Sequence, residues 1–222
     1  MRKLFTVFAL AMTMCIGASA QNHEIYVDYS LPTLKLSEWE KGVKEVEEAD
    51  FKSVELGYNY YMPMKLENLY VTFGGKFSYR WRTFEDYYPD AEESLYRFQL
   101  PVNLKYKFNV ADNFTVEPYA GVNLGYFFTY RYTNRFDDGV AIGTKVTRDM
   151  FEYDDEYNRF SAGWQVGLDL CLNKKFVLGI GYEKDLSYFL AWDTSMDFGS
   201  KVEDEKERMR WSSINIKFGY RF

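Results

Sequence analysis

The chain ends in INIKFGYRF, residues 214–222, where apolar and polar side chains alternate without interruption. Side chains of an extended strand point to opposite faces in turn, so this pattern predicts a β-strand with one apolar and one polar face. The apolar face carries Ile214, Ile216, Phe218, Tyr220 and Phe222. A surface strand of a soluble sandwich would show the same pattern. This strand alone therefore does not tell whether its apolar face meets a protein core or a membrane, and the rest of the chain has to decide.

The same alternation recurs along the chain, in eight runs altogether. These runs are 23–31, 53–62, 68–81, 95–108, 114–128, 161–172, 175–183 and 214–222. Most are long enough to cross a bilayer as tilted strands, which takes about 9–11 residues. The 20 Tyr and 19 Phe residues indicate a large surface covered by aromatic side chains. This pattern predicts an all-β, eight-stranded antiparallel up-and-down transmembrane β-barrel.

The connections between the runs alternate in length. The short ones are 63–68, 109–113 and 173–175, and the long polar ones are 35–50, 82–94, 131–157 and 191–208. Long connections therefore gather at one end of the sheet and short ones at the other. Outer-membrane barrels have this arrangement, with short periplasmic turns and long extracellular loops, whereas a soluble sandwich has no reason to sort its loops in this way.

The N-terminal residues predict a secretory signal. Arg2 and Lys3 precede an apolar stretch from Leu4 to Ile16, and Ala18-Ser19-Ala20 follows it. This layout is typical of a signal peptide cleaved after residue 20, with a mature barrel over 21–222. The apolar stretch is shorter than the roughly 20 residues that an uncleaved spanning helix needs.

The polar face of the runs carries charges of both signs, together with glycines. An eight-stranded barrel has an interior just wide enough for its side chains, so inward charges must neutralise one another. We therefore expect a plugged lumen with a charge network. Its predicted members are Glu24, Asp28, Glu55, Lys76, Arg80, Arg97, Lys105, Lys107, Glu117, Asp169, Glu183, Asp185, Lys217 and Arg221. The more specific functional interpretation of the same charges is a proton or ion path, or paired carboxylates for acid–base catalysis.

Three local features complete the expected architecture. Aromatic residues near strand ends are placed to form interfacial girdles; these are Trp81, Tyr106, Phe108, Phe128, Tyr130 and Tyr188. Pro101 and Pro118 lack a ladder donor, so we expect bulges there. Residues 36–48 predict a short helix, since Ser37 and Glu40 match a capping box, although Gly42 weakens this prediction.

The chain offers little for catalysis or metal binding. His23 is the only histidine and lies at the start of the predicted mature chain, which disfavours a histidine-dependent triad or metal site. Cys171 has no obvious partner for nucleophilic chemistry. The net charge of −6 makes nucleic acid a poor partner. We therefore expect that the protein is not an enzyme and that it has no catalytic residue, metal site or cofactor.

The stretches FQLPVNLKYKF (98–108), EPYAGVNLGYFF (117–128) and IKFGYRF (216–222) resemble the PorT-like outer-membrane barrels of Bacteroidetes-type bacteria. The resemblance covers nearly all of the chain after the signal, and it implies a fold and a bacterial outer-membrane location but no shared activity. In outer-membrane barrels the terminal aromatic, with apolar residues at every second place before it, is a signal for the barrel-assembly machinery. The matching positions are Ile214, Ile216, Phe218, Tyr220 and Phe222.

These observations favour a non-enzymatic outer-membrane protein that is structural, or that binds an unknown extracellular or envelope partner through its long loops. Outer-membrane lipids and, during biogenesis, the barrel-assembly machinery are the other expected partners. A small permeation or ligand-uptake channel is the alternative, motivated by the inward glycines and charges. A membrane-embedded enzyme is motivated only by the inward carboxylates Glu55, Glu117 and Asp169.

Overall fold

The computed structural model describes residues 22–40, 43–84, 91–134, 146–153, 156–197 and 202–222. Its elements are β1 (His23–Glu40), β2 (Val43–Asp50), β3 (Lys52–Pro63), β4 (Leu69–Phe84), β5 (Ala91–Tyr106), β6 (Phe108–Ala111), β7 (Phe114–Asn134), β8 (Val146–Asp149), α2 (Met150–Tyr153), β9 (Phe160–Leu172), β10 (Phe176–Asp185), β11 (Leu190–Asp197) and β12 (Val202–Arg221). Within these ranges, no helix has the length and apolar character needed to span a membrane.

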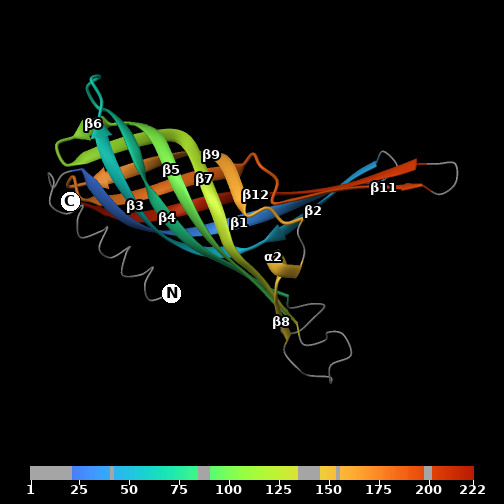
Figure 1. The fold of residues 1–222 in the computed structure, drawn as a ribbon. Helices are drawn as coiled ribbons and strands as arrows, with labels where there is room; N and C mark the ends of the chain where they lie inside the picture. The colour runs from blue at the N-terminus through green and yellow to red at the C-terminus, as the bar shows by residue number, and fades with distance from the viewer. Residues whose placement is uncertain (1–21, 41–42, 85–90, 135–145, 154–155, 198–201) are drawn as a thin grey trace.

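Eight strands form a closed antiparallel ring (Figure 1). Their order is β1-β3-β4-β5-β7-β9-β10-β12, and pairing of β12 with β1 closes the ring. Each of the eight alternating runs supplies one of these strands, and neighbours in the ring follow one another along the chain. The predicted eight-stranded up-and-down barrel is therefore confirmed. The described part of the chain also contains β2, β6, β8 and β11, which extend the ladder beyond the ring.

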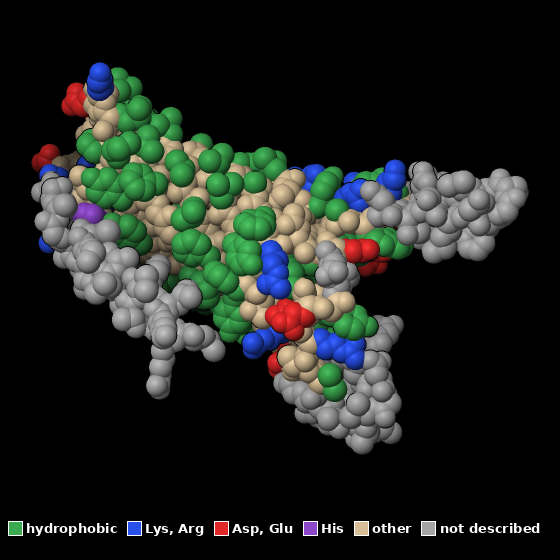
Figure 2. All heavy atoms as spheres, viewed as in Figure 1, with side chains coloured by type: hydrophobic (Ala, Val, Ile, Leu, Met, Phe, Trp, Pro, Cys, Tyr) green, Lys and Arg blue, Asp and Glu red, His purple; other side chains and the backbone are tan. Residues whose placement is uncertain are grey.

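The outer face of the ring is an apolar belt (Figure 2). Along β5, for example, Leu100, Val102 and Leu104 are 44–51% exposed. The belt on this strand runs from Tyr96 to Tyr106, and ten residues at about 3.3 Å each on a strand tilted by about 45° give a height of roughly 23 Å. This height matches the apolar band of about 25 Å in outer-membrane barrels.

Aromatic rings mark both ends of the belt. Towards the long connections, Trp81 stacks on Tyr79 with ring centroids 5.4 Å apart. Towards the short turns, Tyr106 lies 4.7 Å from Phe108. Phe128 is exposed, and Tyr188 is partly exposed. Five of the six predicted girdle residues, Trp81, Tyr106, Phe108, Phe128 and Tyr188, therefore lie where interfacial girdles form.

A bulge in β7 reverses the alternation near the long connections. The register with β5 passes from Arg97–Phe127 to Tyr96–Thr129, which leaves Phe128 as the extra residue. Phe127 is fully buried, Phe128 is 41% exposed, and Tyr130 is 7% exposed. The prediction that Tyr130 belongs to the girdle was therefore wrong, because the bulge turns its ring inward.

The bulges predicted at the two prolines were also wrong. The register of β5 with β7 is unbroken at Pro101, and that of β7 with β9 is unbroken at Pro118. The ladder between β4 and β5 is instead interrupted between Phe73 and Lys76, opposite Pro101. Pro118 lies where the partner of β7 changes from β5 to β6. Both prolines thus sit at gaps in a ladder, where no N–H donor is needed.

Beyond the ring the barrel divides into two projecting sheets (Figure 1). The first projecting sheet has the order β2-β1-β12-β11, and the second consists of the far ends of β4, β5 and β7 with β8. They separate after Lys52–Trp81, the last pair between β3 and β4. Phe51 lies at this point, between β2 and β3, and β2 is paired with β1.

The helix predicted over residues 36–48 is not present, because most of this segment belongs to the first projecting sheet. Leu36 of β1 is paired with Met209 on one side and Glu47 on the other. The long strand β12 supplies hydrogen-bond partners that an isolated segment lacks, and these partners override the local helix pattern. Residues 41 and 42 lie outside the described part of the chain.

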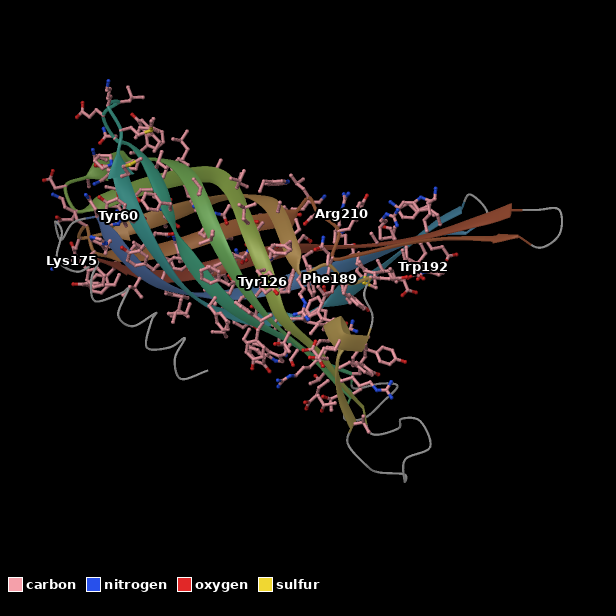
Figure 3. All side chains as sticks on the ribbon, in the orientation of Figure 1. Tyr60, Tyr126, Lys175, Phe189, Trp192 and Arg210 are labelled. Atoms are coloured by element: carbon pink, nitrogen blue, oxygen red, sulfur yellow. The ribbon has the colours of Figure 1, made fainter. Side chains whose placement is uncertain are left out.

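An apolar cluster fills the junction between the ring and the two sheets. We call it the apical cluster; it consists of Leu34, Phe51, Leu95, Phe127, Tyr130, Phe151, Phe189 and Trp211. Its rings contact edge to face or tilted: the Phe51 and Trp211 centroids lie 4.9 Å apart, as do those of Phe127 and Phe189. Figure 3 shows Phe189 at this junction. The cluster holds both projecting sheets against the mouth of the ring.

We expect Phe127→Ala to lower the free energy of unfolding by about 3–5 kcal/mol, because it opens a cavity in a closely packed cluster. Phe128→Ala is the matched control, since the neighbouring ring lies on the exposed face, and we expect a much smaller loss. Urea unfolding of the two purified variants, followed by tryptophan fluorescence, measures both values. Equal losses would contradict the inward placement of Phe127.

Candidate functional site

The lumen near the short turns is filled by a cluster around Arg221. This β12 residue donates to both carboxylate oxygens of Glu117 on β7, with Nη1–Oε1 and Nη2–Oε2 distances of 2.9 and 2.8 Å. Its Nη2 also lies 3.1 Å from Oε2 of Glu24 on β1. The Tyr61 hydroxyl on β3 donates to the same oxygen of Glu24. Four strands are thereby tied together across the interior.

A second group continues the network towards the middle of the barrel. Asp169 on β9 accepts hydrogen bonds from Lys105 on β5 and from Lys217 on β12, the latter at 2.6 Å. Lys217 Nζ also lies 3.2 Å from Glu24 Oε1. Lys217 therefore connects the middle of the network to the cluster around Arg221.

A third group fills the part of the lumen nearest the projecting sheets. Glu183 on β10 accepts from Lys76 and Arg80 of β4, at 2.9 and 3.1 Å. Lys76 also pairs with Glu55 at 2.7 Å. Arg97 lies 3.5 Å from Glu183 and 2.7 Å from Asp185. These side chains are almost completely buried, so each charge depends on its neighbours for stabilisation.

One carboxylate is less well satisfied than the others. Asp28 is 4% exposed, and its Oδ1 has no hydrogen-bond partner among the described residues. It borders a cavity of about 30 Å³ that Lys76, Lys105 and Lys217 also line. This volume exceeds the roughly 10–15 Å³ that one buried water molecule requires. The cavity therefore leaves room for hydration of Asp28.

The apical cluster closes the lumen above this network. The guanidinium carbons of Arg80 and Arg97 lie 4.9 Å from the ring centroids of Trp211 and Phe127, respectively. Such cation–π contacts favour cations beneath a layer of aromatic rings. Along the described part of the lumen, ion pairs therefore give way to aromatic packing.

Above this level Glu93 takes part in a separate interaction. It pairs with Arg82 at 3.2 Å and accepts a hydrogen bond from the Tyr130 hydroxyl. Burial raises the pKa of Glu93, and the Arg82 charge opposes that effect. The apical cluster is thus bordered by one further carboxylate and its cation.

The structure brings together all but one of the charged residues expected in the lumen. The buried members are Glu24, Asp28, Glu55, Lys76, Arg80, Arg97, Lys105, Glu117, Asp169, Glu183, Asp185, Lys217 and Arg221. Lys107 was wrongly included. It is only partly buried and lies at the break between β5 and β6, where the alternation of inward and outward side chains is interrupted.

Sequence reasoning missed the apical cluster. Phe51, Phe151 and Phe189 lie outside the eight runs, and no pattern in their local sequence indicates that their side chains are buried. Phe127 and Phe128 carried a signal, because two adjacent aromatic residues interrupt strict alternation. Trp211 could have been found by extending the inward face of the last run back from residue 215.

His23 and Cys171 are the residues considered for histidine-dependent or nucleophilic catalysis. His23 Nδ1 is 2.6 Å from the Tyr58 hydroxyl, at the end of the barrel with short turns. Cys171 is buried on β9 as a free thiol. In the described ranges, no group of three or more His, Cys, Asp or Glu residues has an arrangement that could hold a metal ion.

A closed up-and-down ring with an apolar outer belt and a filled polar interior defines a small transmembrane β-barrel of the outer-membrane type. The sequence matches the family model described as "Outer membrane protein beta-barrel domain" over residues 6–222. The chain therefore belongs to this family, and its location is the bacterial outer membrane.

Several solved structures are similar to this chain. Ail, the attachment invasion locus protein of Yersinia pestis, shares 16% identity over 89% of this chain and 98% of its own, with a TM-score of 0.39. Neisserial surface protein A shares 15% identity over 89% and 97%, with a TM-score of 0.44. The outer-membrane enzyme PagL shares 9% identity over 82% and 97%, with a TM-score of 0.38. No curated protein sequence matches the chain.

We expect Glu24→Ala to destabilise the barrel by about 3–5 kcal/mol, because it leaves buried cations without their carboxylate. The exposed pair Lys35–Glu48 provides the control. Its side chains are 48% and 52% exposed, so Glu48→Gln should cost at most about 1 kcal/mol. The temperature at which each variant loses its compact gel mobility in detergent reports the difference. Similar midpoints for the two variants would contradict a stabilising role for the network.

Proposed function

We propose that this protein is a non-enzymatic outer-membrane barrel with a plugged lumen, and that its projecting sheets perform its function. The observation that carries this proposal is the continuous filling of the interior. Ion pairs occupy the lumen from Arg221 to Asp185, and the apical cluster covers its mouth. A solute would have to displace buried ion pairs and packed aromatic rings together.

The lumen carboxylates support a structural role over a catalytic one. Glu55 pairs with Lys76, Glu117 with Arg221, and Asp169 with Lys105. A carboxylate held by a buried cation is stabilised in its charged form. This pairing supports a structural role for the three carboxylates over a role in a membrane-embedded enzyme.

The projecting sheets are the surfaces that we assign to binding. In outer-membrane barrels the short turns face the periplasm and the long connections face outward, so both sheets extend outside the cell. They present long strands well beyond the ring (Figure 1). Their partner would be an extracellular molecule or another component of the envelope.

In this proposal the two ends of the chain direct export and insertion of the protein into the outer membrane. Residues 1–20 act as a cleaved signal, and the last strand is recognised by the barrel-assembly machinery. The apolar side chains of that strand point outward and are 38–60% exposed; they are Ile214, Ile216, Phe218, Tyr220 and Phe222. Placement among the PorT-like barrels rests on the resemblance of 98–108, 117–128 and 216–222.

We expect no steady conductance when the purified protein is inserted into a planar lipid bilayer, because the lumen is filled along its length. Single-channel recording at low protein concentration measures this property. A sizeable, steady conductance would overturn the plugged lumen and favour the small permeation or uptake channel.

We expect the first projecting sheet to be dispensable for folding but required for function. Leu36 is paired with Glu47, and Trp192 with Glu207, so residues 37–46 and 193–206 can each be replaced by Asn-Gly, which favours a tight hairpin turn. The trimmed protein should keep its heat-dependent gel shift yet fail to correct the envelope defects of a deletion strain. Lys174→Gln/Lys175→Gln, which alters only an exposed turn at the opposite end of the barrel, is the control and should correct them. Full correction by the trimmed protein would contradict the proposal.

A further inference from the structure

A cluster of basic residues lies on the outward face of the first projecting sheet, just beyond the ring. Lys35 on β1 is directly opposite Arg210 on β12, and Arg208 follows two residues further along the same face. Lys184 on β10 is opposite Ser212, which is two residues from Arg210. We call these four residues, Lys35, Lys184, Arg208 and Arg210, the outer basic cluster. Figure 3 marks Arg210 where the ring passes into the sheet.

The two arginines are held in place by an aromatic ring. The guanidinium carbon of Arg210 lies 3.9 Å from the Tyr188 ring centroid, and that of Arg208 lies 5.4 Å from it. Arg208 Nη1 also donates to the carbonyl oxygens of Trp192 and Glu207, each at 2.9 Å. Stacking on Tyr188 therefore orients two cations on one surface and reduces the conformational entropy lost when they bind an anion.

The charges within the cluster repel one another. Like charges directly opposite on neighbouring strands destabilise a sheet, and Lys35 faces Arg210 in this way. Glu48 pairs with Lys35, but no carboxylate among the described residues pairs with Arg210. The cluster is therefore positively charged on a chain whose net charge is −6. A bound anion would relieve this repulsion.

The position of the cluster identifies where that anion would come from. Lys35 and Arg210 each lie four residues beyond an exposed apolar residue of the belt, Leu31 and Ile214, which are 51% and 52% exposed. Four residues on a tilted strand rise by roughly 9 Å. The polar headgroup region on each side of a bilayer is about 5–8 Å thick. The backbone of both residues therefore lies just beyond the headgroups of the outer leaflet, and their long side chains can reach back to the headgroups.

The two faces of the first projecting sheet differ in charge. On the opposite face, Glu38 is flanked by Glu45 on β2 and Glu207 on β12. The face that continues the lipid-facing belt carries Lys35, Arg208 and Arg210 together with Glu48 and Asp50, whereas the face turned towards the axis of the barrel carries the three glutamates. Figure 2 shows basic side chains next to the end of the apolar belt. This separation supports a negatively charged membrane surface as the partner of the outer basic cluster.

We propose that the outer basic cluster binds the phosphate groups of a phosphorylated glycolipid in the outer leaflet. Arg210 provides the forked donors that suit phosphate oxygens, Arg208 adds a positive charge beside it, and Lys35 and Lys184 add charge on either side. The lipid would anchor the base of the first projecting sheet against the membrane surface. This site is independent of any partner bound further out, so its failure and that of the proposed function are distinguishable.

The test compares binding of detergent-purified protein to phosphatidylcholine vesicles that contain bisphosphorylated lipid A, dephosphorylated lipid A or neither. We expect Arg208→Gln/Arg210→Gln to weaken binding to the bisphosphorylated vesicles by about tenfold or more. Lys174→Gln/Lys175→Gln removes two exposed charges at the short-turn end and is the matched control, which should bind as the unaltered protein does. Heat-dependent gel mobility verifies that each variant is folded.

Further arms keep the proposal falsifiable. Arg208→Lys/Arg210→Lys retains the charges and should recover most of the binding, and Lys35→Gln/Lys184→Gln should weaken binding without altering the Tyr188 contacts. Equal binding to phosphorylated and dephosphorylated lipid A would overturn the proposal. So would an equal loss in the control pair, or displacement of the vesicles by millimolar inorganic phosphate, which would indicate a site for free phosphate.

Discussion

A charge inside a narrow barrel must have a partner, and this constraint determines much of the structure. Glu24, Asp169 and Glu183 each accept from cations that come from other strands. A slip of one residue in any strand would turn its charged side chains to the lipid and its apolar ones to the lumen. The ion pairs therefore fix the register of the ring in addition to filling it.

The same constraint explains why the lumen changes its chemistry at its outer end. Arg80 and Arg97 each meet a carboxylate on one side and an aromatic ring on the other. Cations are suited to this boundary, because they pair with carboxylates and also lie favourably against the faces of aromatic rings. The bulge at Phe128 makes the transition possible. Phe127 and Tyr130 are three residues apart on one strand, and the bulge places both side chains on its inward face.

The sequence predicted the ring and its interior because both depend on a period of two, which each run shows by itself. The projecting sheets could not be predicted in this way, because their strands are stabilised by partners distant in the sequence. Leu36 illustrates this point: its helical spacing is real, but pairing with Met209 decides its conformation. The inward position of Phe51 depends on where the pairing of β3 with β4 ends, and no local sequence pattern predicts that point.

The ladder between β1 and β12 continues from Glu24–Arg221 in the ring to Trp39–Lys206 in the first projecting sheet. These strands are also the first and the last of the ring, so the seam that closes the barrel and the centre of the sheet are one structure. A pull on the sheet along its strands would load this ladder in shear, with many hydrogen bonds sharing the force at once. A contact made by this sheet far from the membrane would therefore transmit tension directly to the seam that closes the barrel.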